Sequence, residues 1–259
     1  MGGRLDLVFL IAPLLFLIVV VFDLPLLNIV YWSVSDTATG AFTLQHFRDF
    51  AASNAYLRII WRTLVIALEV TLLTILLGYP LAYWVTKLPY RLRMVMLGLV
   101  VMTFWVSILV RTYAWIVILG NAGLVNRTLQ WLGATDRPIE FLYNELGILI
   151  GMVNVLLPFL VLPLYAAMMR VDQRLLQVAE TLGASRSRIF WQVFFPLTIP
   201  TLAASAVLGG GRVPLIANMM DLLINRFARW EVAAVVSVVL MLVTLPLYAV
   251  YQWLRERPQ

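Results

Sequence analysis

The sequence predicts an all-α polytopic membrane protein with six transmembrane helices, the fifth short or incomplete, in one domain over residues 1–259. Two observations support this prediction. Hydrophobic residues make up 63% of the chain and charged residues only 12%, against roughly 45–50% and about 25% in soluble domains. Several apolar runs are also about 20 residues long or longer, which is the length that a helix needs to cross a bilayer. A membrane barrel would instead show short alternating strands, and the sequence has none.

Five stretches have the length and apolarity of a transmembrane helix. In order they are Leu7–Trp32, Thr63–Thr86, Met94–Leu119, Leu146–Met169 and Val232–Tyr251. The first is too long for a signal peptide and has no small-residue cleavage site, so we expect an uncleaved first helix.

The remaining crossing would be the fifth in chain order, within Ile189–Gly211. This stretch is uncharged, but it contains Pro196 and Pro200. The run Leu197–Leu208 would rise by only about 18 Å as a helix, against a hydrocarbon core of roughly 30 Å. We therefore expect Ile189–Leu208 to make a strained or incomplete crossing.

The basic residues predict the orientation of the chain in its membrane. The short connection Lys87–Arg93 carries three basic residues and no acid, whereas Gly120–Glu145 carries more acids than bases. By the positive-inside bias, the first connection is cytoplasmic and the second is outside. The N-terminus is then cytoplasmic, and Arg255 and Arg257 favour a cytoplasmic C-terminus as well.

Residue counts exclude several classes of function. The chain has no cysteine and one histidine, His46, so a disulfide framework, a thiol nucleophile and a histidine-rich metal centre are excluded. The net charge is +6, but no basic run is long enough to follow a phosphate backbone, so no nucleic-acid partner is expected. We expect no cofactor. Gly209–Arg212 lacks the spacing of a phosphate-binding loop, so we expect no ATP site and no enzymatic activity.

The most informative segment lies at about residues 170–196, which we call the coupling loop. Asp172–Leu182 is predicted to form a short amphipathic helix that Gly183 ends. Its apolar face is expected to hold Leu175, Leu176, Ala179 and Leu182. Such a helix can dock in the groove of a partner or lie on the membrane surface, and the residues alone leave both open.

The coupling loop resembles the EAA loop of permease subunits in binding-protein-dependent ABC importers. That family has Glu-Ala-Ala, three residues, Gly, nine residues, Ile, one residue and Leu-Pro. The matching positions here are Gln177, Val178, Ala179, Gly183, Val193, Phe195 and Pro196. The spacing is kept, but the acidic first position is Gln177, and Glu180 is the nearest acid that could replace it.

Two further stretches resemble the spermidine/putrescine-type branch of that family, Leu77–Trp84 and Phe104–Trp115. With the coupling loop they extend the resemblance over about residues 62–255. It implies half of a translocation pathway for polyamine or a similar small organic solute, working by alternating access. The implied partners are ATP-binding cassette ATPase subunits that hydrolyse ATP, a second permease subunit, similar or identical, and a periplasmic substrate-binding protein. In this family a full membrane crossing follows the coupling loop. The short fifth stretch of this chain does not supply a full crossing.

Four residues in the predicted spans are candidates for the substrate path: Glu69, Trp105, Arg111 and Tyr113. Charged groups in a membrane are costly unless they are paired or face water. Glu69 and Arg111 have comparable predicted depths, so they form either a structural ion pair or part of the path. Trp105 and Tyr113 could stack on an organic cation, although Tyr113 also suits an interfacial aromatic belt.

Two other functions are alternatives. An ion-coupled secondary transporter usually has several titratable residues along its path and inverted repeats, and the sequence shows few of the former and no repeat. A decayed, non-transporting permease relative is compatible with the short fifth stretch.

Overall fold

A computed structural model describes residues 11–36, 39–210, 222–226 and 229–255. The described residues are helical, apart from turns and one isolated antiparallel bridge between Ser35 and Phe42. The chain forms two compact units. The end unit comprises Met1–Thr63 and Pro214–Val250, and the middle unit comprises Leu64–Val213 and Tyr251–Gln259.

The predicted fold class is confirmed by the helices that the structure describes. Four stretches are long and apolar enough to cross a membrane, and Trp230–Pro246 is a shorter apolar helix. The four are Ile11–Val34, Asn54–Lys87, Ile108–Trp131 and Glu145–Arg170. Three of them match predicted spans in place, whereas Ile108–Trp131 overlaps only the second half of the predicted Met94–Leu119. The total of six crossings stays a prediction.

The end unit has its own small apolar core. Its elements are η1 (Val19–Asp23), α2 (Leu24–Val34), α3 (Gln45–Ala52), the start of α4 (Asn54–Lys87), η3 (Leu222–Arg226) and most of α13 (Trp230–Arg255). Phe50 of α3 and Leu223 of η3 pack with the start of α13, where Val235 and Val236 are fully buried. Phe50 also stacks on Tyr56, with ring centroids 5.5 Å apart. These contacts fix the start of α13 against α3 and the start of α4.

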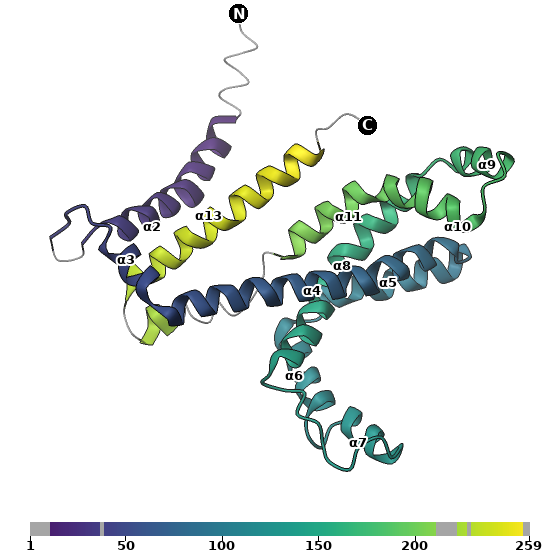
Figure 1. Ribbon diagram of the computed structural model, residues 1–259, viewed down its shortest axis with the longest axis horizontal. Coiled ribbons are helices and arrows are strands. Elements are labelled where there is room, and N and C mark those ends of the chain that lie inside the picture. The colour runs from purple at the N-terminus through teal and green to yellow at the C-terminus, as the bar shows by residue number, and fades with distance from the viewer. Residues whose placement is uncertain (1–10, 37–38, 211–221, 227–228, 256–259) are drawn as a thin grey trace, which may run out of the picture. The chain divides into compact units, whose positions relative to one another are not determined.

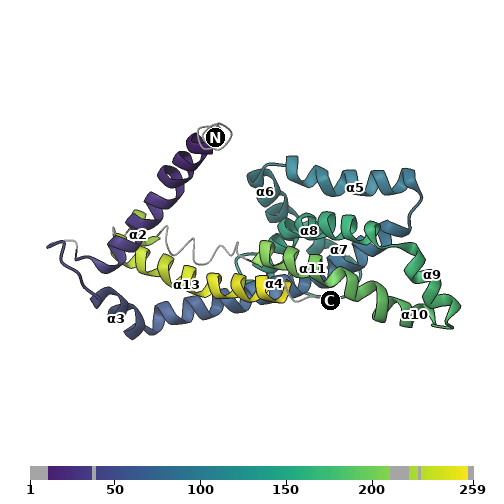
Figure 2. The ribbon, with the colours of Figure 1, turned by 90° about the horizontal axis from the view of Figure 1, so that it is seen from above.

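The middle unit contains the coupling loop. After α4 come α5 (Tyr90–Trp105), α6 (Ile108–Leu119), α7 (Leu124–Trp131), α8 (Glu145–Arg170), α9 (Gln173–Thr181), α10 (Arg186–Ile189), η2 (Phe190–Phe194) and α11 (Phe195–Gly210). Its core joins α4, α8 and η2 around Tyr79, Leu164 and Phe194. Figures 1 and 2 show α9 and α10 beyond one end of α8, and Figure 1 shows α6 and α7 beyond the other. The coupling loop is therefore a projection at one end of the packed helices.

Two π-helical turns, η2 and η1, each end two residues before a proline. In η2 the Phe195 N–H bonds the Phe190 carbonyl, and in η1 the Leu24 N–H bonds the Val19 carbonyl. Pro196 and Pro25 follow those residues. A proline ring clashes with the carbonyl four residues earlier in an α-helix, and a wider turn makes room for it.

The π turn lets the predicted fifth crossing start earlier than the prolines suggest. α10, η2 and α11 run on without a break from Arg186 to Gly210, 25 helical residues. At 1.5 Å per residue this run is about 37 Å long, enough for the hydrocarbon core. The crossing of this run stays a prediction, and Gly211, Arg212 and Arg257 lie outside the described residues.

The predicted helix Met94–Leu119 is wrong as one continuous element. α5 ends at Trp105 and α6 starts at Ile108. Val106 (φ −77°, ψ 122°) and Ser107 (φ −52°, ψ 141°) between them are extended. Neither residue is a proline or a glycine, so composition gave no sign of the break.

Candidate coupling loop and transport path

The coupling helix α9 is capped at both ends. At its start, the Asp172 carboxylate accepts a hydrogen bond of 2.9 Å from the Arg174 N–H, which satisfies one of the free donors of the first turn. At its end, Gly183 has φ +80°. The Gly183 N–H bonds the Glu180 carbonyl (3.0 Å), and the Ala184 N–H bonds the Ala179 carbonyl (3.1 Å). This pair of bonds is a Schellman motif, which needs a left-handed residue at Gly183.

The apolar residues of α9 divide between two faces, which corrects the single face predicted from the sequence. Leu176 is partly buried against the core of the middle unit. Leu175, Val178 and Leu182 are 49%, 56% and 82% exposed, and their spacing of three and four residues places them on one side of the helix. We call these three residues the outer face of α9. Leu176 anchors the helix, and none of the described residues covers the outer face.

The polar positions of the predicted motif also face outward. Gln177 and Glu180 are exposed, whereas Ala179 is partly buried and Gly183 ends the helix. The Gln177 amide at the first motif position and the nearby Glu180 carboxylate are therefore both accessible to a partner.

An aromatic cluster connects the coupling loop to α4, and the sequence reasoning missed it. Its members are Tyr79 and Tyr83 of α4 with Phe190, Trp191, Phe194 and Phe195 of the returning chain. The Tyr83 ring lies 5.2 Å from Phe190 and 5.4 Å from Phe194, edge to face in both cases. The Lys87 ammonium lies 5.0 Å from the Tyr83 ring centroid. The four-residue spacing of Tyr79, Tyr83 and Lys87 was the available signal, because such residues share one face of a helix.

A buried hydrogen bond fixes the same junction. The Thr198 hydroxyl donates to the Phe195 carbonyl at 2.8 Å, and the Tyr79 hydroxyl lies 3.0 Å from the Thr198 oxygen. Because the single proton of Thr198 is already used, Tyr79 is the donor. Phe195 and Pro196 of the motif therefore begin α11 at a point held by α4. Val193 is partly buried in the preceding turn. The segment that returns from the coupling loop is thus packed as part of the helical core.

The ion pair considered for Glu69 and Arg111 is not formed within the described part of the chain. The Arg111 guanidinium donates instead to the carbonyl of Thr103 and, at 3.4 Å, to that of Val106. These carbonyls lie at the break between α5 and α6, where regular helical partners are missing. Glu69 is exposed on α4. Arg111 therefore acts as a cap for a broken helix, a role that residue types alone did not indicate.

We expect Arg111→Met to destabilise the chain while Glu69→Gln does not. Loss of the guanidinium leaves two carbonyls of the break without a donor, which costs about 1–3 kcal/mol. Unfolding free energies of the two single variants and the double variant should add within about 0.5 kcal/mol. A coupling energy well above that value would show that Glu69 and Arg111 do interact.

The four path candidates are not joined to one another in the described structure. No hydrogen bond, ion pair or ring contact connects any two of Glu69, Trp105, Arg111 and Tyr113 among the described residues. Trp105 and Tyr113 are 86% and 69% exposed, so each ring is open to a ligand, a lipid or a second subunit. No group of three or more potential metal ligands occurs in the described residues.

Comparison with known proteins gives close agreement in sequence. The chain is 32% identical over 231 residues to the spermidine/putrescine transport system permease protein PotB of Escherichia coli K12, covering 83% of each protein. It is 35% identical over 213 residues to PotB of Haemophilus influenzae, covering 76% of this chain and 74% of that protein. It is 34% identical over 204 residues to the putative 2-aminoethylphosphonate transport system permease protein PhnU of Salmonella typhimurium, covering 78% of this chain and 70% of that protein. No protein-family model matches the chain.

Solved structures agree in fold. The chain superimposes on a chain of a bacterial ABC transporter involved in the import of the acidic polysaccharide alginate, with a TM-score of 0.77 and 18% identity. The match covers 99% of this chain and 98% of the other. At this identity the likeness establishes the fold alone.

Proposed function

This chain belongs to the family of the spermidine/putrescine transport system permease proteins, and we propose that it forms half of the translocation pathway of a polyamine importer. The family consists of transport subunits of the bacterial inner membrane. The proposed substrate class rests on the names of the relatives at 32–35% identity.

The observation that supports this proposal most directly is the outer face of α9. Three apolar side chains on this face are exposed, those of Leu175, Val178 and Leu182. On the opposite side of the helix, Leu176 packs against the core of the middle unit. Exposed apolar side chains rimmed by polar ones are typical of a protein interface. We propose that an ATP-binding cassette ATPase subunit covers this face, with Gln177 and Glu180 at the rim of the contact.

The packing behind α9 suggests how movement of the ATPase reaches the membrane helices. Tyr79 and Tyr83 connect the returning chain to α4 through ring contacts and the bond to Thr198. Packed aromatic rings resist sliding, so a displacement of α9 should move α4 and α11 together. In this proposal ATP is hydrolysed by the partner, and alternating access follows from rigid-body motion of the helices.

The remaining partners and the orientation belong to the same proposal. A second permease subunit, similar or identical, closes the other half of the path, and a periplasmic binding protein delivers the substrate. The N-terminus is cytoplasmic, so the coupling loop is as well. Glu69, Trp105 and Tyr113 are candidates for the path, with Arg111 holding the turn that positions Trp105.

Uptake of radiolabelled spermidine tests the proposal in a host that lacks its own polyamine uptake. The chain is produced with its ATPase, second permease and binding protein, and uptake is expected only when all are present. Val178→Asp and Leu182→Asp should abolish uptake and ATPase co-purification, because a carboxylate on an apolar contact is desolvated without a partner. Absence of uptake by the wild-type assembly would contradict the proposed function.

Leu132→Asp is the matched control for these variants. Leu132 is 64% exposed after α7, away from the coupling loop, so ATPase co-purification should be unchanged. Since Val178 and Leu182 are also exposed, their substitution has little effect on folding. Equal co-purification of all three variants would exclude the outer face of α9 as the docking surface.

A further inference from the structure

One side of the short helix α7 is not covered by any of the described residues. The helix runs from Leu124 to Trp131. Leu124 is 68% exposed and Trp131 is 84% exposed. Thr128 lies between them on the same side of the helix, and its hydroxyl already donates to the Leu124 carbonyl at 2.8 Å. We call these three residues the open face of α7.

The opposite side of α7 is fixed by the fully buried side chain of Asn126. The Asn126 amide donates to the carbonyls of Gly120 and Ile139, at 3.0 Å each. Its side-chain oxygen accepts the Ile139 N–H at 2.8 Å. A rotation of α7 about its own axis would break all three bonds. The open face is therefore held in its outward direction.

The open face begins beside the end of α6. Between the two helices the chain turns within residues 120–123. A Cβ atom on Gly123 would lie 2.7 Å from the Val117 carbonyl oxygen and still closer to that of Ile118. Only glycine lets the backbone approach the last turn of α6 this closely. Leu124 follows Gly123 directly, so the first residue of the open face lies next to this turn.

α6 is the end of a predicted membrane span. The span was predicted to end at Leu119, which is also the last residue of α6. Leu109, Val110 and Val117 of this mostly apolar helix are all exposed, and lipid tails can cover such a surface in a bilayer. The turn at residues 120–123 separates α7 from the span. The open face thus continues an apolar surface at the level where the span leaves the hydrocarbon core.

The residues of α7 suit that level. Tryptophan is enriched at membrane–water interfaces, where its ring lies among the lipid head groups. Arg127 is exposed, and its spacing from Leu124 and Trp131 places it at the edge of the open face. Helices that lie on a membrane combine leucine and tryptophan on one face with basic residues beside it.

We propose that α7 lies in the membrane–water interface, with Leu124 and Trp131 among the lipids and the Arg127 guanidinium at their phosphate groups. The predicted orientation places this contact in the outer leaflet. Through the bonds of Asn126 to Ile139, the lipid contact also holds the segment that leads into α8. The proposal goes beyond the proposed function, because it is independent of which substrate is carried.

Site-directed spin labelling tests the proposal. The chain contains no cysteine, so a single introduced cysteine carries the nitroxide label in a complex whose partner subunits are made cysteine-free. The complex is placed in nanodiscs of phosphatidylethanolamine and phosphatidylglycerol. Relaxation of the label is compared for oxygen, which concentrates in lipid, and for a nickel chelate, which stays in water.

Leu124→Cys and Trp131→Cys are compared with Gln130→Cys. Gln130 is exposed but lies away from the open face, so it is the matched control. An interfacial helix buries its apolar face by about 5–10 Å, so the ratio of oxygen to nickel relaxation should be at least about threefold higher at Leu124 and Trp131 than at Gln130. All three side chains are exposed, so these substitutions have little effect on folding.

Each other outcome overturns the proposal. Equal ratios at the three positions would place α7 in water. Labels at Leu124 and Trp131 that are shielded from both reagents would show that a second subunit covers the open face. Nickel access that is lost only when the binding protein is added would show a protein contact. Uptake of spermidine by the wild-type assembly decides the proposed function separately, since uptake with α7 in water would leave that function standing.

Discussion

Gly183→Pro is expected to abolish both polyamine uptake and co-purification of the ATPase. Gly183 ends α9 at φ +80° and donates its N–H to the Glu180 carbonyl. Proline fixes φ near −65° and has no N–H, so the end of the helix cannot form, at a cost of about 3 kcal/mol or more. Because Leu182 of the outer face immediately precedes this turn, docking should weaken at least about tenfold. Pull-down of the ATPase with the tagged permease measures the effect.

Gly133→Pro is a control with the same local geometry. Gly133 ends α7 at φ +68°, and the N–H groups of Gly133 and Ala134 bond the carbonyls of Gln130 and Leu129. The same substitution therefore breaks the same motif outside the coupling loop, and ATPase co-purification should persist. Gly183→Asn should retain it as well, since asparagine tolerates the left-handed conformation. Equal losses in both proline variants would indicate general misfolding instead of a docking defect.

The coupling helix could be predicted because its signals are local. Asp172 and Gly183 mark the ends of α9, and both form the caps expected of their residue types. Which apolar residues face inward could not be predicted, because Leu175 and Leu176 are adjacent and equally apolar. Contact with the core decides between them, and it selects Leu176.

The break between α5 and α6 illustrates what sequence patterns omit. Val106 and Ser107 lie in an apolar run that would suit one helix, so composition predicted a single span. The structure divides the run, and Arg111 supplies donors to the carbonyls at the break. The sequence marks Arg111 as a costly charge in a predicted membrane helix, but its partner is the backbone, which no sequence pattern displays.

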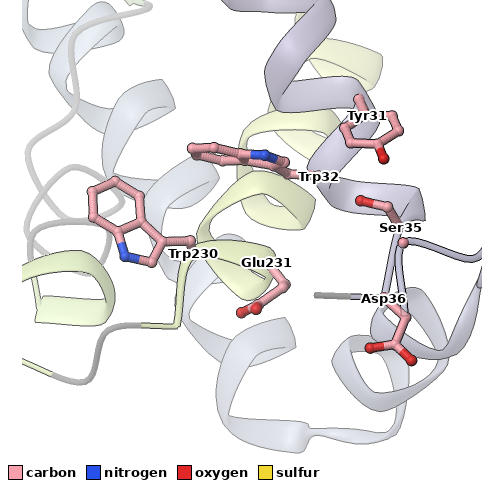
Figure 3. A pocket seen from close by; sticks show the side chains of 7 residues that line it. Tyr31, Trp32, Ser35, Asp36, Trp230 and Glu231 are labelled. Carbon is pink, nitrogen blue, oxygen red and sulfur yellow. The ribbon is translucent and has the colours of Figure 1, made fainter. Parts of the chain in front are cut away.

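The prolines of the fifth predicted span do not end the helix there. The sequence rule ends or kinks a helix before Pro196. Here the wider π turn over Phe190–Phe194 leaves room for the Pro196 ring, and the helix continues as α11. The contact between Trp32 and Trp230 in the end unit (Figure 3) could not be predicted for another reason, because tertiary packing alone brings these residues together.

Gly78→Ile is expected to lower the melting temperature of the purified permease by about 5–10 °C. A Cβ atom at Gly78 in α4 would lie 2.4 Å from Cδ2 of Leu160 and 3.6 Å from Cγ2 of Val161 in α8. Leu160 and Val161 are 2% and 0% exposed, so neither has space to move aside for a branched side chain. Small residues at such crossings allow membrane helices to approach closely. Thermal unfolding followed by fluorescence-detected size exclusion measures the shift.

Gly98→Ile is the control, because a Cβ atom at Gly98 in α5 meets nothing within 4 Å. Its melting temperature should change by less than about 2 °C. If Gly78 acts through the contact with Leu160, then Leu160→Ala should restore part of the stability lost in Gly78→Ile, so the two substitutions should be strongly non-additive. Independent losses in the double variant would show that α4 and α8 do not meet at this point. The result would also bear on transport, since the same crossing supports Tyr79 and hence the attachment of the coupling loop.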